Sequence, residues 1–124
     1  MKSARSEKRL TVGGQEYLLL YNMAALADAE NRTGKSVTEL ARGASNGSLG
    51  IGDVANLFVA GLEAARRAYH TTSRAFQLQR AYELMEQAGY AKVATTVFEG
   101  VADVLGFDPD EDEDADDSAD PPAK

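Results

Sequence analysis

The side chains that could carry out acid–base or nucleophilic chemistry are few in this sequence and are not grouped. His70 is the only histidine, and no serine lies in a G-x-S-x-G turn that would present a nucleophile to it. The chain has no cysteine, which rules out a cysteine nucleophile and a thiolate zinc site. The carboxylates of residues 1–107 fall mainly on the polar faces of predicted helices. There we expect them to be solvated surface charges and not members of a catalytic acid–base pair. We therefore expect no enzymatic activity, no cofactor and no metal site.

Two further segments have the composition of ligand-binding loops but lack the residues that such loops require. Asp108, Asp110 and Asp112 begin in the manner of a calcium-binding EF-hand loop. Glu113, however, occupies the position of the required glycine, and Ala119 occupies that of the final glutamate. The sequence GASNGSLGIG is glycine-rich but does not end in the Gly-Lys-Ser/Thr of a phosphate-binding loop. We interpret it as a connector between two helices.

Most of the net charge of −7 belongs to the C-terminal end of the chain. From Asp108 onward there are nine acidic residues and one lysine, whereas residues 1–107 contain 11 acidic and 12 basic residues. Eight of these 12 basic residues form an N-terminal cluster and a group around His70. The group around His70 lacks the row of exposed aromatic residues that stacks on bases. The two groups are Lys2, Arg5, Lys8 and Arg9, and Arg66, Arg67, Arg74 and Arg80. We expect no nucleic-acid partner; the acidic end would serve solubility, repel other proteins, imitate nucleic-acid charge or dock on a basic patch.

The N-terminal part of the sequence predicts a β-hairpin. Residues 9–12 and 16–21 have the composition of strands, and the Gly-Gly pair between them accepts the positive φ of a two-residue turn. The second strand is apolar from Tyr17 to Tyr21 without alternation, which predicts that both of its faces are covered. We expect one small helical body to cover one face only, so that a partner would cover the other.

Five helices follow the hairpin in the predicted fold, which is therefore of the α+β class. Apolar residues recur at the spacing of one helix face, and the predicted boundaries are 23–32, 36–42, 53–69, 74–88 and 91–105. Asn22 is a suitable N-cap for the first helix, and Ser36 with Glu39 forms a capping box for the second. Glycines suited to end a helix follow the first, fourth and fifth predicted helices, at Gly34, Gly89 and Gly106. A threonine or serine at 71–73 is expected to cap the fourth helix.

The sequence divides into three parts. Residues 1–7 predict a flexible basic N-terminus, residues 8–107 the domain of hairpin and helices, and residues 108–124 a disordered acidic tail. The tail has no large apolar residue and contains all three prolines. No apolar run approaches the about 20 residues of a membrane helix, and no apolar core follows MKSARSEKR as in a signal peptide. With the lack of cysteine, this predicts a protein of the cytoplasm.

A small domain with an apolar hairpin has surface left over for a partner. The outer edges of a two-stranded sheet carry unpaired amide groups, on which a partner or a second copy of the chain can dock. Phe76 falls off the main apolar stripe of its predicted helix and is therefore a candidate contact residue. The candidate partner-binding residues come from the hairpin and the helices: Tyr17, Leu18, Leu19, Leu20, Leu26, Leu57, Phe58, Leu62 and Phe76.

From about residue 10 to residue 107, the order of these parts resembles the tail assembly chaperones of long-tailed bacteriophages and bacterial gene transfer agents. These small proteins are sometimes labelled tail tube proteins. YLLLYNMAALADAE and LFVAGLEAA are similar to family patterns through Asn22, Ala25, Leu26 and Glu30, and through Leu57, Gly61 and Leu62. The basic start of HTTSRAFQLQRAYELM departs from the Pro-containing, acidic helix start of many relatives.

The resemblance implies a non-enzymatic role in tail assembly. Family members are thought to bind apolar segments of the tape measure protein and keep this long helical chain soluble until tail tube subunits polymerise around it. The implied partners are the tape measure protein and the tail tube protein. Association of the chain with further copies of itself, as a homo-oligomer, is a third possibility. The implied location is the cytoplasm of the bacterial host and not the finished particle. Two alternatives also stay open: a tail tube or connector component retained in the particle, and an acidic regulatory binding protein.

Overall fold

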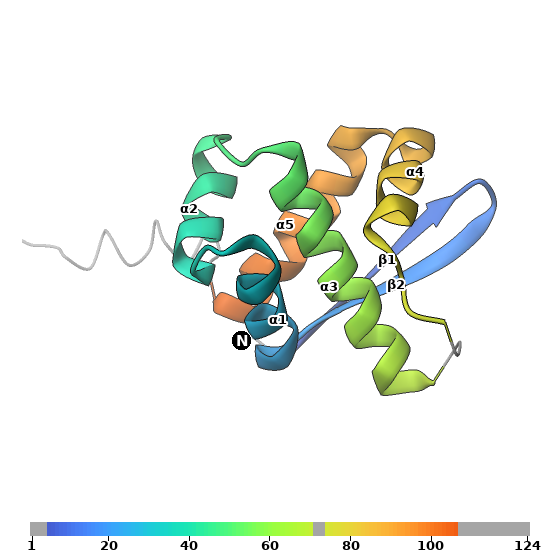
Figure 1. Ribbon diagram of the computed structural model, residues 1–124, viewed down its shortest axis with the longest axis horizontal. Coiled ribbons are helices and arrows are strands. Elements are labelled where there is room, and N and C mark those ends of the chain that lie inside the picture. Colours follow the sequence, from blue (N-terminus) through green and yellow to red (C-terminus); the bar gives the residue numbers. More distant parts are fainter. Residues whose placement is uncertain (1–4, 71–73, 107–124) are drawn as a thin grey trace, which may run out of the picture.

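The computed structural model describes residues 5–70 and 74–106, which form a two-stranded hairpin followed by five helices (Figure 1). This confirms the predicted α+β class and the order of elements. The predicted acidic tail lies outside the described residues. The elements are β1 (Ser6–Val12), β2 (Gln15–Tyr21), α1 (Met23–Thr33), α2 (Val37–Asn46), α3 (Ile51–Tyr69), α4 (Leu78–Ala88) and α5 (Tyr90–Leu105).

The hairpin has the turn that its sequence predicts. β1 and β2 pair antiparallel, with Val12 opposite Gln15 next to the turn. Gly13 and Gly14 both have positive φ, 58° and 81°, which matches the right-handed twist of the strands and favours glycine. β1 begins three residues before the predicted start, because Ser6 joins the ladder and is held by α5, where its hydroxyl donates to Asp103.

The predicted caps of the first two helices are present. The side chain of Asn22 accepts a hydrogen bond from the backbone N–H of Ala25 at 2.8 Å, and Gly34 ends α1 in the left-handed conformation. Ser36 and Glu39 form the reciprocal capping box of α2. α2 runs four residues beyond its predicted end and α3 starts at Ile51, so the glycine-rich connector is shorter than expected.

The prediction that the fourth helix begins at residue 74 is wrong. α4 begins at Leu78, and its N-cap, Gln77, makes no side-chain capping bond. The backbone N–H of Phe76 donates instead to the carboxylate of Glu63 on α3, at 2.6 Å, which fixes residues 74–77 in a non-helical path along α3. We call residues 74–77 the strap. The threonine and serine predicted to cap this helix lie at 71–73, outside the described residues.

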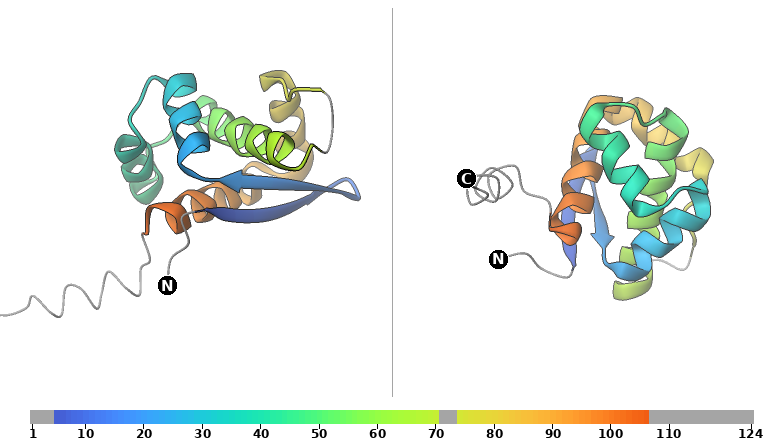
Figure 2. Two further views of the ribbon diagram at one scale, coloured as in Figure 1. Left: turned by 90° about the horizontal axis from the view of Figure 1, so that it is seen from below. Right: turned by 90° about the vertical axis from the view of Figure 1, so that its left-hand side faces the viewer.

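The helices of the chain cover both faces of part of the hairpin, contrary to our expectation. The hairpin lies between α5 on one side and α1 with α3 on the other (Figure 2). Leu19 and Leu20 point to opposite faces, as successive strand residues do, and both are buried. Toward the turn one face is open, but it carries the ion pair between Arg9 and Glu16. No partner is needed to cover the apolar strand.

Tyr21 is the centre of the core where α3 and α5 meet the end of β2. The side chain is completely buried, and its hydroxyl donates to the carbonyl oxygen of Leu57 at 2.8 Å. Its ring lies against Gly61 of α3 and Gly100 of α5, where a Cβ atom would come within 2.6 Å of the ring. The two glycines allow the helices to approach the hairpin closely.

Candidate protein-binding groove

A groove of about 420 Å³ opens along the outer edge of β2, within the usual size range of ligand pockets. β2 contributes four consecutive residues although their side chains alternate between faces, so the groove follows the strand edge that does not pair with β1. α3, the strap and α4 form the other walls. The lining residues are Gln15, Glu16, Tyr17, Leu18, Leu62, Ala65, Arg66, Phe76 and Arg80.

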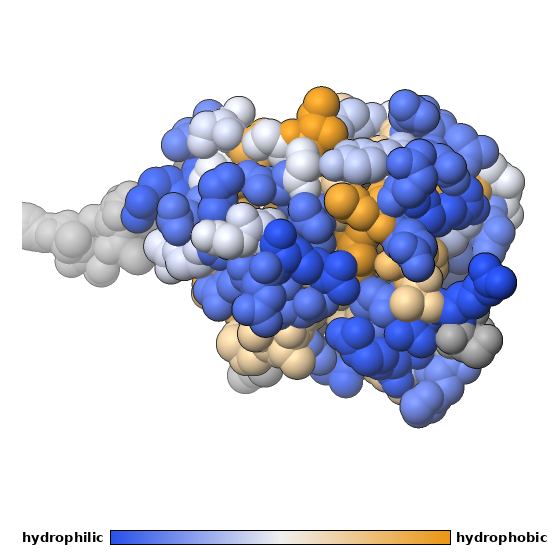
Figure 3. Space-filling model, viewed as in Figure 1, coloured by the Kyte–Doolittle hydropathy of each residue, from blue (hydrophilic) through white to orange (hydrophobic). Residues whose placement is uncertain are grey.

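Aromatic and aliphatic side chains give the groove an apolar wall. The rings of Phe76 and Tyr17 pack edge to face, with centroids 6.3 Å apart. Leu18 is half-buried beside them. Figure 3 shows residues of high hydropathy exposed between α3 and α4, within a surface that is otherwise mostly hydrophilic. Such a wall excludes water from apolar side chains that enter it.

Two arginines, together with Gln15 and Glu16 of β2, form the polar part of the groove. Arg80 donates to the hydroxyl of Tyr17 at 3.2 Å and pairs with Glu83 at 3.3 Å. The Tyr17 hydroxyl and Glu83 raise the pKa of Arg80, which is charged at any physiological pH. Arg66 lies on the opposite wall and is held by Glu63. The groove therefore offers apolar contact and positive charge together.

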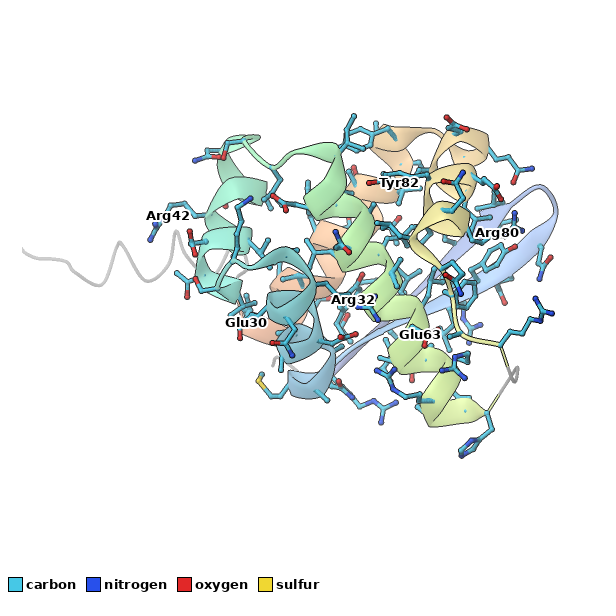
Figure 4. All side chains as sticks on the ribbon, in the orientation of Figure 1. Glu30, Arg32, Arg42, Glu63, Arg80 and Tyr82 are labelled. Carbon is cyan, nitrogen blue, oxygen red and sulfur yellow. The ribbon has the colours of Figure 1, made fainter. Side chains whose placement is uncertain are left out.

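Glu63 connects α3 to the strap and to Arg66 beneath the groove. Its side chain is 4% exposed and accepts bonds from Arg66 at 2.8 and 3.0 Å and from the Phe76 N–H at 2.6 Å, with Arg67 at 3.6 Å. Burial alone would raise the pKa of Glu63, but Arg66, the Phe76 N–H and Arg67 outweigh it and lower the pKa. In Figure 4 Glu63 and Arg80 lie on the side of the hairpin and strap, with Arg42 at the other end of the molecule.

A second hollow of about 230 Å³ lies between α2 and the start of α3. Its lining contains two cations and two carboxylates, and Lys35 pairs with Asp53 at 2.6 Å. Leu49 is its one large apolar residue. This hollow has the balanced charge of ordinary surface and lacks an apolar wall, so the groove at β2 is the better candidate for binding a protein.

The structure brings together four of the predicted contact residues and separates the others. Tyr17, Leu18, Leu62 and Phe76 line the groove, but Tyr17 and Leu62 are 8% and 1% exposed, so Leu18 and Phe76 provide most of the accessible apolar surface among these four. The other five are buried in the core with at most 3% exposure, so they give a partner no accessible surface in this conformation: Leu19, Leu20, Leu26, Leu57 and Phe58. Sequence reasoning did not place Ala65, Arg66 or Arg80 in the site. The two arginines could have been predicted as groove residues from the sequence, because they lie on either side of Phe76, at residues 66 and 80.

The groups considered for chemistry do not converge. In the described parts of the chain, no three His, Cys, Asp or Glu side chains are placed to hold a metal ion. His70 is exposed and ends α3 in the left-handed conformation, with φ of 52°. Within the same residues, no helix is both long and apolar enough to span a bilayer.

A family model agrees with the resemblance expected from the sequence. The model described as "Phage tail tube protein, GTA-gp10", a tail assembly chaperone family, matches residues 5–102. The match includes both strands, the strap and nearly all of α5. No curated protein and no solved structure shows significant similarity to the chain. The chain therefore belongs to this phage and gene transfer agent family of tail assembly chaperones, which are non-enzymatic and have other tail proteins as partners.

Proposed function

We propose that the protein binds apolar helical segments of the tape measure protein in the groove along β2 and keeps that chain soluble until tail tube subunits replace it. The proposal places this activity in the cytoplasm of the bacterial host. The observation that carries it is an apolar groove in a member of a tail assembly chaperone family, in which Leu18 and Phe76 are partly exposed beside the buried ring of Tyr17.

The shape of the groove suits a helix that inserts a few side chains. An amphipathic helix presents anchors at i, i+3, i+4 and i+7, and a volume of about 420 Å³ accommodates only a few large side chains at once. The arginines at its rim favour a helix that carries acidic residues beside its apolar anchors. A contact of this size is modest, which suits a chaperone because tail tube subunits must displace it.

Co-expression with the tape measure protein tests the proposal. We expect the wild-type chain to raise the soluble fraction of the tape measure protein and to co-purify with it. Leu18→Glu and Phe76→Glu each place a charge in the apolar wall and should weaken binding at least about tenfold, because central apolar contacts dominate such interfaces. Affinity is measured by calorimetry on the purified pair.

Two exposed apolar residues outside the groove supply matched controls. Met23 and Ile51 are 60% and 61% exposed and do not line the groove, so Met23→Glu and Ile51→Glu should leave binding unchanged. An equal loss with these controls would remove the groove from the proposal. If the tape measure protein is equally insoluble with and without this chain, the chaperone function itself is contradicted. Recovery of the chain in purified particles would favour a structural tail component.

A further inference from the structure

We propose that the acidic C-terminal segment, residues 108–124, docks in the same molecule on the arginine side chains at the mouth of the groove. It would then compete with a partner for that surface. The inference rests on the proposed function only in placing a partner in the groove, since docking of the segment needs no partner. The segment would act as an internal substitute for the acidic part of a ligand.

Positive charge exceeds negative charge around the groove. The surface considered comprises the lining residues, their ion-pair partners, and the second arginine that pairs with Glu63. It contains four arginines, Arg9, Arg66, Arg67 and Arg80, and three glutamates, Glu16, Glu63 and Glu83. Of the three glutamates, Glu63 is buried and its charge is matched by Arg66 and Arg67. An acidic segment therefore meets a net positive surface here.

The arginines retain donors for a further anion. A guanidinium has five N–H donors, and the bonds of Arg80 to Tyr17 and Glu83 involve only two of its nitrogen atoms. The side chains of Arg67 and Arg80 are 52% and 46% exposed, so carboxylates can reach them from solvent. Each exposed ion pair contributes little, about 0.2–1 kcal/mol, but several carboxylates in one segment can act together.

The segment carries the matching charge and has the required reach. Nine acidic residues and one lysine follow Gly106, and eight of the acids precede residue 118. α5 runs from the α4 end of the molecule to the end where the described chain stops (Figure 1). α5 packs along the hairpin, and its 16 residues span about 24 Å. The acidic run 110–117 begins four residues after Gly106 and reaches about 13–36 Å when extended.

The covalent connection makes weak docking effective. A segment joined covalently to the domain through a few residues has an effective concentration in the millimolar range at its site. Weak ion pairs suffice for partial occupancy at low salt, and screening should release the segment as salt rises. A partner would then bind more tightly at high salt, or to a chain whose segment is neutralised, than to the wild-type chain at low salt.

A spin label in the segment tests this directly on the full-length chain without a partner. The chain has no cysteine, so Ala115→Cys gives a single labelling position in the middle of the acidic run. At about 20 mM salt, where screening is weak, we expect amide NMR signals of Leu18, Ala65 and Arg80 to lose at least about half of their intensity. Signals of α1 should lose little. At about 500 mM salt the groove signals should recover.

Paired charge variants decide between docking on the groove and general attraction. Arg67→Gln with Arg80→Gln should abolish the loss of groove signals, whereas Arg32→Gln with Arg42→Gln removes the same charge from α1 and α2 and should not. Broadening that is uniform, independent of salt, or centred on α2 would overturn the proposal. Because no tape measure protein is present, these outcomes are independent of whether the chaperone function is correct.

Discussion

Gly61→Ala is expected to destabilise the domain by about 2 kcal/mol, although alanine is the better helix former. The added Cβ atom would lie 2.6 Å from Cζ and Oη of Tyr21. The ring cannot move aside, because its hydroxyl is bonded to Leu57 of α3 and its other side lies against Gly100 of α5. The helices must therefore separate from the hairpin. Thermal unfolding should show a decrease in Tm of about 10 °C, since 1 kcal/mol corresponds to about 4–8 °C in a domain of this size.

The same helix contains a matched control. Gly52 also lies in α3, but a Cβ atom there would meet only the Tyr82 hydroxyl, at 3.9 Å. Gly52→Ala should therefore be neutral or stabilise the domain by up to about 1 kcal/mol through helix propensity. Equal effects of the two substitutions would show that packing against Tyr21 is not what requires a glycine at residue 61.

Removing the ring should make room for the methyl group at residue 61. Tyr21→Leu alone loses buried surface and the bond to Leu57, which should cost about 2–4 kcal/mol. In the double variant Tyr21→Leu/Gly61→Ala the methyl group occupies space that the ring has left, so the combined loss should be at least about 1 kcal/mol less than the sum. Strict additivity would contradict a direct contact between Tyr21 and Gly61.

The parts of the fold that could be predicted are those specified by residues close in sequence. The Gly13-Gly14 turn, the Asn22 cap and the Ser36–Glu39 capping box each depend on groups within four residues, and all are present. The apolar stripe of α3 was recognisable because six residues recur with helical period, and all six are buried: Val54, Leu57, Phe58, Gly61, Leu62 and Ala65. Local chemistry sets these elements independently of their packing.

The start of α4 and the groove depend on contacts between residues far apart in sequence. The strap is non-helical because Glu63, 13 residues earlier, binds the Phe76 N–H, and no local signal marks this bond. The unbroken apolar run of β2 was correctly taken to mean two covered faces. We expected a partner protein to cover the second face of β2, because the sequence does not show that α5 folds back on the hairpin. Phe76 was identified as surface, but its contact with Tyr17 follows from the strap.

Glu63→Gln is expected to destabilise the domain by about 2 kcal/mol at pH 7 and to loosen the strap. Glutamine keeps the size of the side chain but loses the charge that Arg66 and the Phe76 N–H stabilise, and hydrogen bonds to charged groups are worth about 1.5–3 kcal/mol. Native-state hydrogen exchange gives a local readout, because the Phe76 amide should exchange faster while amides of α1 change less. Glu83→Gln removes an exposed partner of Arg80 and should change stability by less than about 1 kcal/mol.

The pH dependence of stability separates the charge of Glu63 from its packing. The folded state lowers the pKa of Glu63 below the ordinary value of 4.5, so the unfolded chain takes up the proton first as the pH falls. The stabilisation by the carboxylate is therefore fully present above about pH 5 and decreases as the pH falls through 4.5 and then through the folded pKa. The Tm of the wild-type chain should approach that of Glu63→Gln toward pH 3. A constant difference between the two from pH 7 to pH 3 would show that shape, and not charge, holds the strap on α3.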